Sequence, residues 1–232
     1  MKKTVSFKAA AAYAIALTAL FSCQKQNTYD WSVLQPNATV TIKPTENGSF
    51  YMQLDDNTTL VATNVGKSPF GDREVRAILN FSEENAPHDG YSKAVKVHWM
   101  DSILTKNTVP APGEDEIDGY GSDPVEIFND WITYVEDGYF TLHFTTVWGR
   151  PNVRHAVNLL TGTNPDDPYE VVFRHNAFGD TCGEHHDGIA AFRLSELPDT
   201  NGETVKLTLK WNSFSGEKKA VFDYRTRQDR GN

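Results

Sequence analysis

The sequence of 232 residues contains only two cysteines, Cys23 and Cys182. A framework of several disulfide bonds is therefore excluded. Long apolar stretches are also scarce, because the longest is a thirteen-residue run at 9–21. A helix that spans a bilayer needs about 20 apolar residues, so this run is too short to cross a membrane.

Basic side chains are few: 22 lysines and arginines stand against 31 aspartates and glutamates, for a formal charge of −9. If residues 1–22 are removed, Lys2, Lys3 and Lys8 are lost with no acid, which leaves 19 basic and 31 acidic side chains and a charge of −12. Such a chain repels nucleic acid and anionic lipid headgroups at long range. We therefore expect no nucleic-acid partner.

Motifs of common catalytic sites are absent from the sequence, including Gly-x-Ser-x-Gly, the phosphate loop, His-Glu-x-x-His and the calcium-loop spacing. A cysteine–histidine nucleophile would have to use Cys182 and a neighbouring histidine. No orienting third group or oxyanion-binding turn can be identified beside them. The sequence predicts a protein that is not an enzyme and needs no cofactor.

The N-terminus has the layout of a lipoprotein export signal over residues 1–22. A basic start is followed by the apolar run, which closes with Ser22 before Cys23. In this pattern Cys23 carries the lipid, such as palmitate, and several acyl chains on one cysteine hold a protein on a membrane. Residues 23–36 are polar and predict a tether. With Cys23 acylated, Cys182 has no partner for an internal disulfide.

Alternating apolar residues indicate a first β domain over 37–106. About five strands are expected between Thr39 and Leu104, and Asn47-Gly48 favours a two-residue hairpin turn between the first two. The acidic, proline- and glycine-rich segment 107–122 predicts a linker, although a long solvated hairpin loop is the alternative. A second β domain is expected over 123–230, where about seven strands and the turn pair Asp137-Gly138 indicate an antiparallel sandwich.

Several segments of this second domain resemble the NigD-like lipoproteins of Bacteroidetes. The resemblance is carried by 123–127, 130–132 and 136–140 at its start and by 207–211 and 221–224 at its end. It implies an all-β chain, with a small five-stranded OB-like barrel followed by an antiparallel β-sandwich. It further implies a role in bacteriocin immunity, proposed from the operon that names the family. Because residues 24–27 contain no acid, an outer-membrane anchor that faces the periplasm is expected.

One loop carries the best candidate for a metal site. Cys182, His185 and His186 lie close together in the sequence, and His175 ends the strand before them. Thiolate and imidazole groups are zinc ligands. However, adjacent histidines point to opposite faces of an extended segment, and a polar loop between two strands is the alternative interpretation.

A ligand groove on the barrel is the second candidate site, because OB-type barrels bind ligands on one face where aromatic side chains stack. Tyr51, Tyr91 and Trp99 are the candidates, although Trp99 shares a face with Val95 and Val97 and therefore also fits the core. Few basic residues lie between them, which favours an oligosaccharide or peptide. Two hypotheses follow: an envelope lipoprotein that binds a protein or glycan partner, and a periplasmic protein that captures a glycan or metal ion.

Overall fold

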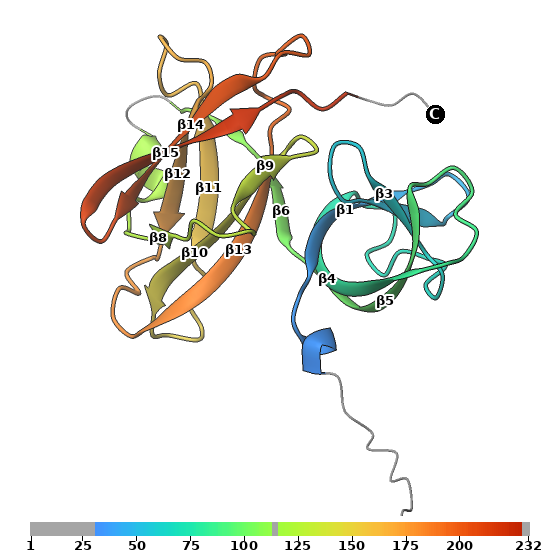
Figure 1. Cartoon of the computed structure of the whole chain (residues 1–232). Helices are drawn as coiled ribbons and strands as arrows, with labels where there is room; N and C mark the ends of the chain where they lie inside the picture. The colour runs from blue at the N-terminus through green and yellow to red at the C-terminus, as the bar shows by residue number, and fades with distance from the viewer. Residues whose placement is uncertain (1–30, 113–115, 229–232) are drawn as a thin grey trace, which may run out of the picture. The chain divides into compact units, whose positions relative to one another are not determined.

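The computed structural model describes residues 31–112 and 116–228, so the expected signal at 1–22, Cys23 and most of the tether lie outside the described residues. The described ranges form an all-β structure with two short 3₁₀ turns and no α-helix (Figure 1). None of the helices in these ranges is long and apolar enough to span a membrane. The elements are η1 (Trp31–Leu34), β1 (Ala38–Pro44), β2 (Phe50–Gln53), β3 (Thr59–Ala62), β4 (Val75–Glu84), β5 (Lys93–Ser102), β6 (Leu104–Asn107), β7 (Val109–Pro110), η2 (Ile117–Tyr120), β8 (Glu126–Ile127), β9 (Tyr134–Glu136), β10 (Tyr139–Trp148), β11 (Ala156–Thr161), β12 (Glu170–Asn176), β13 (Glu184–Arg193), β14 (Val205–Ser213) and β15 (Gly216–Tyr224).

Strands β1 to β5 close into a barrel in the order β1-β2-β3-β5-β4, which confirms the expected five-stranded first domain. Alternation places one face of each strand inside, where the side chains of Val40, Ile42, Met52, Leu60 and Leu79 are fully buried. The turn between β1 and β2 differs from the expected two-residue hairpin. The amide of Thr45 donates to the carbonyl of Ser49, so the loop holds three residues, with Gly48 at φ 77°.

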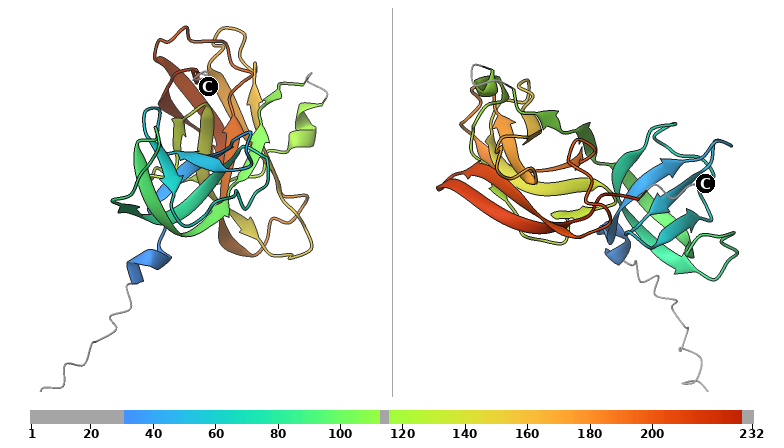
Figure 2. Two further views of the ribbon diagram at one scale, coloured as in Figure 1. Left: turned by 90° about the vertical axis from the view of Figure 1, so that its right-hand side faces the viewer. Right: turned by 90° about the horizontal axis from the view of Figure 1, so that it is seen from above.

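The second domain is a sandwich of two sheets, seen from two further directions in Figure 2. One sheet has the order β6-β13-β10-β8, with β9 also paired to β10, and the other has the order β15-β14-β12-β11-β7. The Asp137-Gly138 hairpin is present, because Tyr139 pairs with Glu136 across it. Three of the pairings are parallel, namely β6 with β13, β7 with β11 and β12 with β14, so both sheets are mixed.

The sandwich begins earlier in the sequence than the composition of the chain suggests. Strand β6 lies at the end of the expected first domain and β7 lies in the expected linker, yet each pairs with a sandwich strand. Both are too short to show the alternation by which strands are detected in a sequence. Short β8, which pairs with β10, escapes detection for the same reason.

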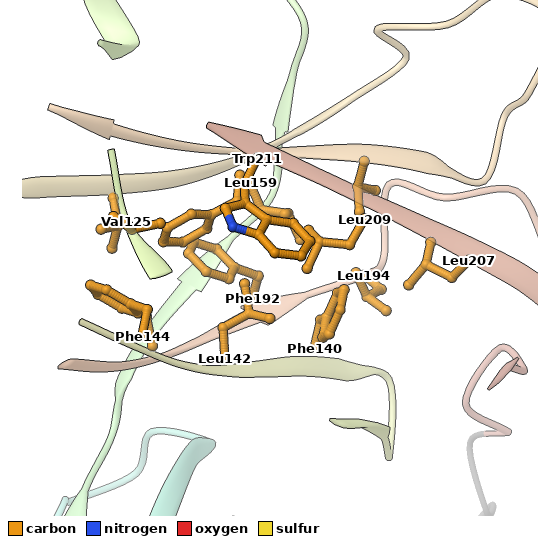
Figure 3. Close-up of a cluster of buried hydrophobic side chains, with 14 of the residues drawn as sticks. Val125, Phe140, Leu142, Phe144, Leu159, Phe192, Leu194, Leu207, Leu209 and Trp211 are labelled. Carbon is orange, nitrogen blue, oxygen red and sulfur yellow. The ribbon is translucent and has the colours of Figure 1, made fainter. Parts of the chain in front are cut away.

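Figure 3 shows the core of the sandwich, where side chains from both sheets meet. Phe140, Leu142 and Phe192 from one sheet and Leu159 and Leu209 from the other are fully buried. These positions alternate with outward-facing ones along their strands, as two packed sheets require. Packing in this core holds the strands in place, and with them the ends of the loops that connect the strands.

Candidate functional site

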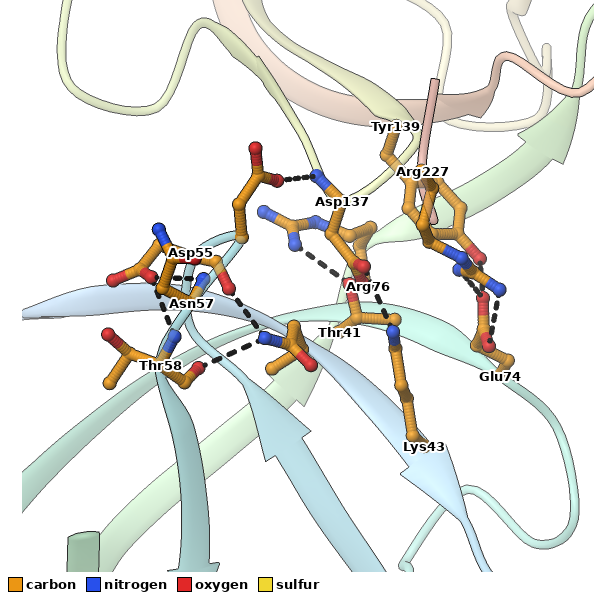
Figure 4. Close-up of polar contacts among 12 residues, drawn as sticks. Thr41, Lys43, Asp55, Asn57, Thr58, Glu74, Arg76, Asp137, Tyr139 and Arg227 are labelled. Carbon is orange, nitrogen blue, oxygen red and sulfur yellow. Dashed lines mark hydrogen bonds and ion pairs between the residues drawn. The ribbon is translucent and has the colours of Figure 1, made fainter. Parts of the chain in front are cut away.

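The barrel and the sandwich meet around Arg76 of β4, whose side chain is completely buried. Its guanidinium donates to the hydroxyl of Thr41 at 2.9 Å (Figure 4) and to the hydroxyl of Tyr134 in β9. The guanidinium carbon also lies 5.9 Å from the centroid of the Tyr139 ring in β10. A buried charge is tolerated only where it is hydrogen-bonded or paired. Arg76 thus ties β9 and β10 of the sandwich to the barrel.

Beside this contact a cleft of about 570 Å³ opens between strands of the barrel and loops of the sandwich, and we call it the polar cleft. The barrel contributes the end of β1, strand β2 and the loop that follows β2. The sandwich contributes the turn between β9 and β10 and the chain that follows β15. Its lining includes Lys43, Glu46, Tyr51, Gln53, Asp56, Asn57, Glu74, Asp137, Arg225, Arg227 and Gln228.

Most charged side chains of the polar cleft are paired with one another. Lys43 Nζ lies 2.9 Å from Asp137 Oδ1, and Arg225 contacts Asp56 at 3.0 Å. A third pair joins Arg227 to Glu74 at 2.7 Å. Each pair links a barrel residue to a sandwich residue, so the cleft depends on both domains.

The carboxylate of Glu74 is the most strongly held of these acids. Burial disfavours its charge, but hydrogen bonds from Arg227 and from the hydroxyl of Tyr139, at 2.6 Å, outweigh burial and lower the pKa of Glu74. In turn, burial first and then Glu74 raise the pKa of Tyr139 to about 12. Tyr139 therefore stays protonated and donates to Glu74 over the physiological range.

Asp137 has a different role, because only one of its two carboxylate oxygens is used. Its side chain is 5% exposed, and Oδ2 has no hydrogen-bond partner among the described residues. The residue occupies the left-handed region at φ 49°, which the turn before Gly138 imposes and which aspartate tolerates. A buried acceptor that the protein leaves unsatisfied is a place for a donor from outside the chain.

Of the three aromatic residues of the expected barrel groove, two lie together in the structure. Tyr51 lines the polar cleft, and Tyr91 packs against it with 5.3 Å between ring centroids. Trp99 is half-buried on β5, where its indole nitrogen donates to the carbonyl of Val33 at 2.6 Å. Two of the three candidates are thus brought together, and the third holds the chain that leads into the barrel.

A second feature lies at one end of the sandwich, and we call it the aromatic end. Strand β10 finishes there at Trp148, β13 begins there antiparallel to β10, and β12 and the parallel β14 both finish there. Three aromatic side chains of this end remain exposed: Trp148 by 37%, Phe178 by 59% and Phe214 by 46%. The backbones of Trp148 and Gly183 approach so closely that a Cβ on Gly183 would lie 2.4 Å from the Trp148 carbonyl oxygen.

A polar network supports the aromatic end from beneath. Trp148 stacks on His155 with 4.9 Å between centroids, and His155 Nδ1 lies 2.9 Å from Nε2 of buried His175. His175 Nδ1 faces the carbonyl of Asp123 at 3.3 Å, so it donates there and His155 donates to His175. On the other side, the carboxylate of Asp180 lies 3.4 Å from His155 Nε2 and accepts the amide of Arg150 at 2.9 Å.

The four expected metal ligands lie near this network but do not converge. His185 and His186 belong to strand β13 and point to opposite faces, since one contacts Phe214 and the other contacts Trp148. Cys182 is exposed, whereas His175 is buried and engaged as described. Within residues 31–112 and 116–228, no three histidine, cysteine or acidic side chains are grouped to hold a metal ion. The metal site stays a prediction from the sequence.

Most residues of both features were not identified from the sequence. The cleft depends on Lys43, Asp137 and Arg227, which are about ninety residues apart and carry no local motif. The turn pair Asp137-Gly138 was the one available signal, and it predicts a turn rather than a site. At the aromatic end, Trp148, Phe178 and Phe214 follow strands that were identified, but only the strand order shows that they share one end.

Both domains match family models. Residues 39–103 match the NigD-like N-terminal OB domain, and residues 107–224 match the NigD-like C-terminal beta sandwich domain. No curated protein matches the chain significantly.

Solved structures of several other proteins have the same fold. A protein of Parabacteroides distasonis described as toxin-related is 34% identical, with a TM-score of 0.69 over 82% of this chain and 92% of that one. A protein of unknown function from Bacteroides vulgatus is 19% identical, with a TM-score of 0.68 over 84% and 93%. A NigD-like immunity protein of Bacteroides caccae is 17% identical, with a TM-score of 0.59 over 81% and 96%. With an OB-type barrel and a β-sandwich that both match the family models, this chain belongs to the NigD-like family.

Proposed function

We propose that this chain is a lipid-anchored protein of the cell envelope that protects its host by binding another protein through the aromatic end. Acylation at Cys23 holds it on the outer membrane, facing the periplasm. The protein acts by binding and not by catalysis, as an immunity or envelope-protection factor.

The observation that carries this proposal is the exposure of Trp148, Phe178 and Phe214 on one rigid end of the sandwich. Tryptophan and other aromatic side chains are enriched at protein interfaces, where a few of them supply most of the binding energy. The stacking of Trp148 on His155 fixes its ring before a partner arrives. A preordered side chain loses less entropy on binding.

Charge supports a basic partner. Without residues 1–22 the chain carries a formal charge of −12, which attracts cationic proteins and repels acidic ones at long range. The anchor supports the same function, because a protective factor that faces the periplasm meets an incoming protein before that protein reaches the inner membrane. The immunity protein of Bacteroides caccae, which shares the fold, supports protection as the outcome of binding.

The test is a bacteriocin sensitivity assay in the host strain with the gene deleted. The deletion is complemented with the wild type, with Cys23→Ala, and with a Trp148→Ala/Phe214→Ala double variant. We expect deletion to increase killing, the wild type to restore resistance, and both variants to fail despite normal protein levels. A Val221→Ala variant, which removes an exposed apolar side chain from the middle of β15, is the control and should restore resistance. Unchanged killing after deletion contradicts the immunity role.

The polar cleft supports a second candidate function, the capture of a small polar ligand in the periplasm. Its volume of about 570 Å³ lies within the range of about 300–1,000 Å³ in which proteins hold small molecules. Native mass spectrometry of protein purified from its own host tests this function, which predicts a retained small molecule. Protein that carries no added mass and binds no small polar ligand offered to it contradicts this function.

A further inference from the structure

We infer that the polar cleft is a saccharide site that takes the end of a neutral oligosaccharide. This inference rests on the second candidate function, since it names the ligand class of that site. It is independent of protein binding at the aromatic end.

The charges of the cleft argue for a neutral ligand. The three cations Lys43, Arg225 and Arg227 are each engaged by a carboxylate of the cleft. A phosphate or carboxylate ligand would have to compete with those carboxylates for the cations. The fourth carboxylate, that of Glu46, leaves the lining with a formal charge of −1, which further disfavours an anion.

The polar groups of the cleft suit a ligand with several hydroxyls. Oδ2 of Asp137 is a buried acceptor with no partner among the described residues, and a hydroxyl is a donor that satisfies it without adding charge. Near it, Asn57 supplies an amide group that both donates and accepts, and Gln53, whose Nε2 donates to the carbonyls of Asp55 and Thr58, keeps its Oε1 as an acceptor. Hydroxyl groups, which also do both, match such a mixed lining.

The ring of Tyr51 supplies the apolar part of the site. It lines the cleft and is supported from behind by Tyr91, at an interplanar angle of 31°. Burial first, and then the nearby Asp137 carboxylate, raise the pKa of Tyr51, so its hydroxyl remains a donor. A ring beside hydroxyl-binding groups fits a pyranose, whose C–H faces are apolar and whose edges are polar.

The position on the barrel is consistent with this ligand class. Tyr51 and Gln53 lie on β2, and most other barrel residues of the cleft lie at the end of β1 or in the loops on either side of β2. OB-type barrels bind oligonucleotides or oligosaccharides on this part of their surface. The acidic charge of the chain leaves the oligosaccharide as the fitting class.

The test is an oligosaccharide array probed with the full acylated chain in a detergent without a sugar headgroup. The array presents neutral, carboxylated and sulfated oligosaccharides. Calorimetry then measures the affinity of the strongest neutral one for the wild type and its variants. We expect neutral members to bind and anionic members to fail.

Three substitutions test the site. Asp137→Asn preserves the turn and Tyr51→Ala removes the ring, and each should weaken binding by roughly 10- to 100-fold. Tyr51→Phe, which removes only the hydroxyl, should weaken it by less and keeps the test valid if another variant does not fold. The matched control is Asp223→Asn, which changes an exposed acid on β15 and should bind as the wild type does.

The inference is overturned if no neutral oligosaccharide binds, if only anionic ones bind, or if Asp137→Asn and Tyr51→Phe both bind like the wild type. Native mass spectrometry distinguishes a wrong ligand class from the absence of ligand capture. A retained molecule that is not a saccharide preserves ligand capture and eliminates the ligand class. Protein without any retained molecule, together with an array that shows no binding, eliminates both.

Discussion

The guanidinium carbon of Arg76 lies 5.5 Å from the centroid of the Tyr134 ring, and the same guanidinium donates to the Tyr134 hydroxyl. Arg76 belongs to the barrel and Tyr134 to the sandwich. The contact brings a charged group of one domain onto an aromatic face of the other, away from solvent. This contact is one of several that join the two domains beside the polar cleft.

Replacement of Arg76 by methionine should lower the free energy of unfolding by about 1–3 kcal/mol, because the hydroxyls of Thr41 and Tyr134 lose a charged donor in a buried site. Arg76→Lys should lose less, since it keeps the charge but not the planar fork. Urea denaturation measures both variants. A loss below about 0.5 kcal/mol for Arg76→Met, the level of a surface substitution, would contradict this role.

The pH dependence of stability should report on Glu136, which lies near Arg76. Burial, followed by the carboxylates of Asp56 and Asp55, raises the pKa of Glu136 to about 7 against the attraction of Arg76. The folded state therefore holds a proton that the unfolded state releases above about pH 4.5, so this group costs stability as the pH rises from about 4.5 to 7.

Glu136→Gln removes this cost. Urea denaturation at pH 5 and pH 8 should show that the variant gains stability relative to the wild type at pH 8 and gains less at pH 5. The difference between the two proteins isolates Glu136 from all other titrating groups. An equal difference at both pH values contradicts the raised pKa.

Gly138→Ala, in the wall of the polar cleft, should lower the thermal stability of the protein by more than backbone strain alone would. Gly138 has φ 74°, where an L side chain costs about 1–2 kcal/mol, and its new Cβ would lie 3.1 Å from the Cβ of Arg227. Gly162→Ala is the matched control, because Gly162 has φ 68° and no atom within 4 Å of the added Cβ. Thermal unfolding should show the larger loss for Gly138→Ala, and equal losses would show that Arg227 does not constrain the turn.

Cys23→Ala should release the protein from the membrane fraction, because the acyl chains on this residue are its proposed anchor. Cell fractionation and the mass of the mature N-terminus measure the effect. Cys182→Ala, which changes the other cysteine, should remain on the membrane with an unchanged acyl mass. A Cys23→Ala product that stays on the membrane after normal removal of residues 1–22 contradicts the anchor.

Most of the fold was predictable because apolar and polar residues alternate along its long strands. Val40 and Ile42 in the barrel, and Phe140 and Leu142 in the sandwich, follow the two-residue period that marks a half-buried strand. The sequence could not reveal β6 and β7, which are short and pair in parallel with strands more than forty residues away.

The candidate site was less predictable, for a physical reason. Arginine is rarely fully buried. Nothing near Arg76 in the sequence indicates that two tyrosines of the other domain contact it. His185 and His186 were assigned to a loop, but pairing of β13 with β10 extends the strand through both of them. Their separation onto opposite faces agrees with the argument made from their adjacency. Only Tyr51, among the residues of the polar cleft, was identified in advance.

The proposed function depends most on the aromatic end as the surface that receives a protein partner. The direct measurement is photo-crosslinking in intact cells, with a photoreactive amino acid placed at Trp148, at Phe214 or, as the control, at Val221 on β15. We expect one and the same basic protein to be crosslinked from Trp148 and from Phe214, and none from Val221. Crosslinks from Val221 equal to those from the two aromatic positions, or no crosslink from either aromatic position, would contradict it.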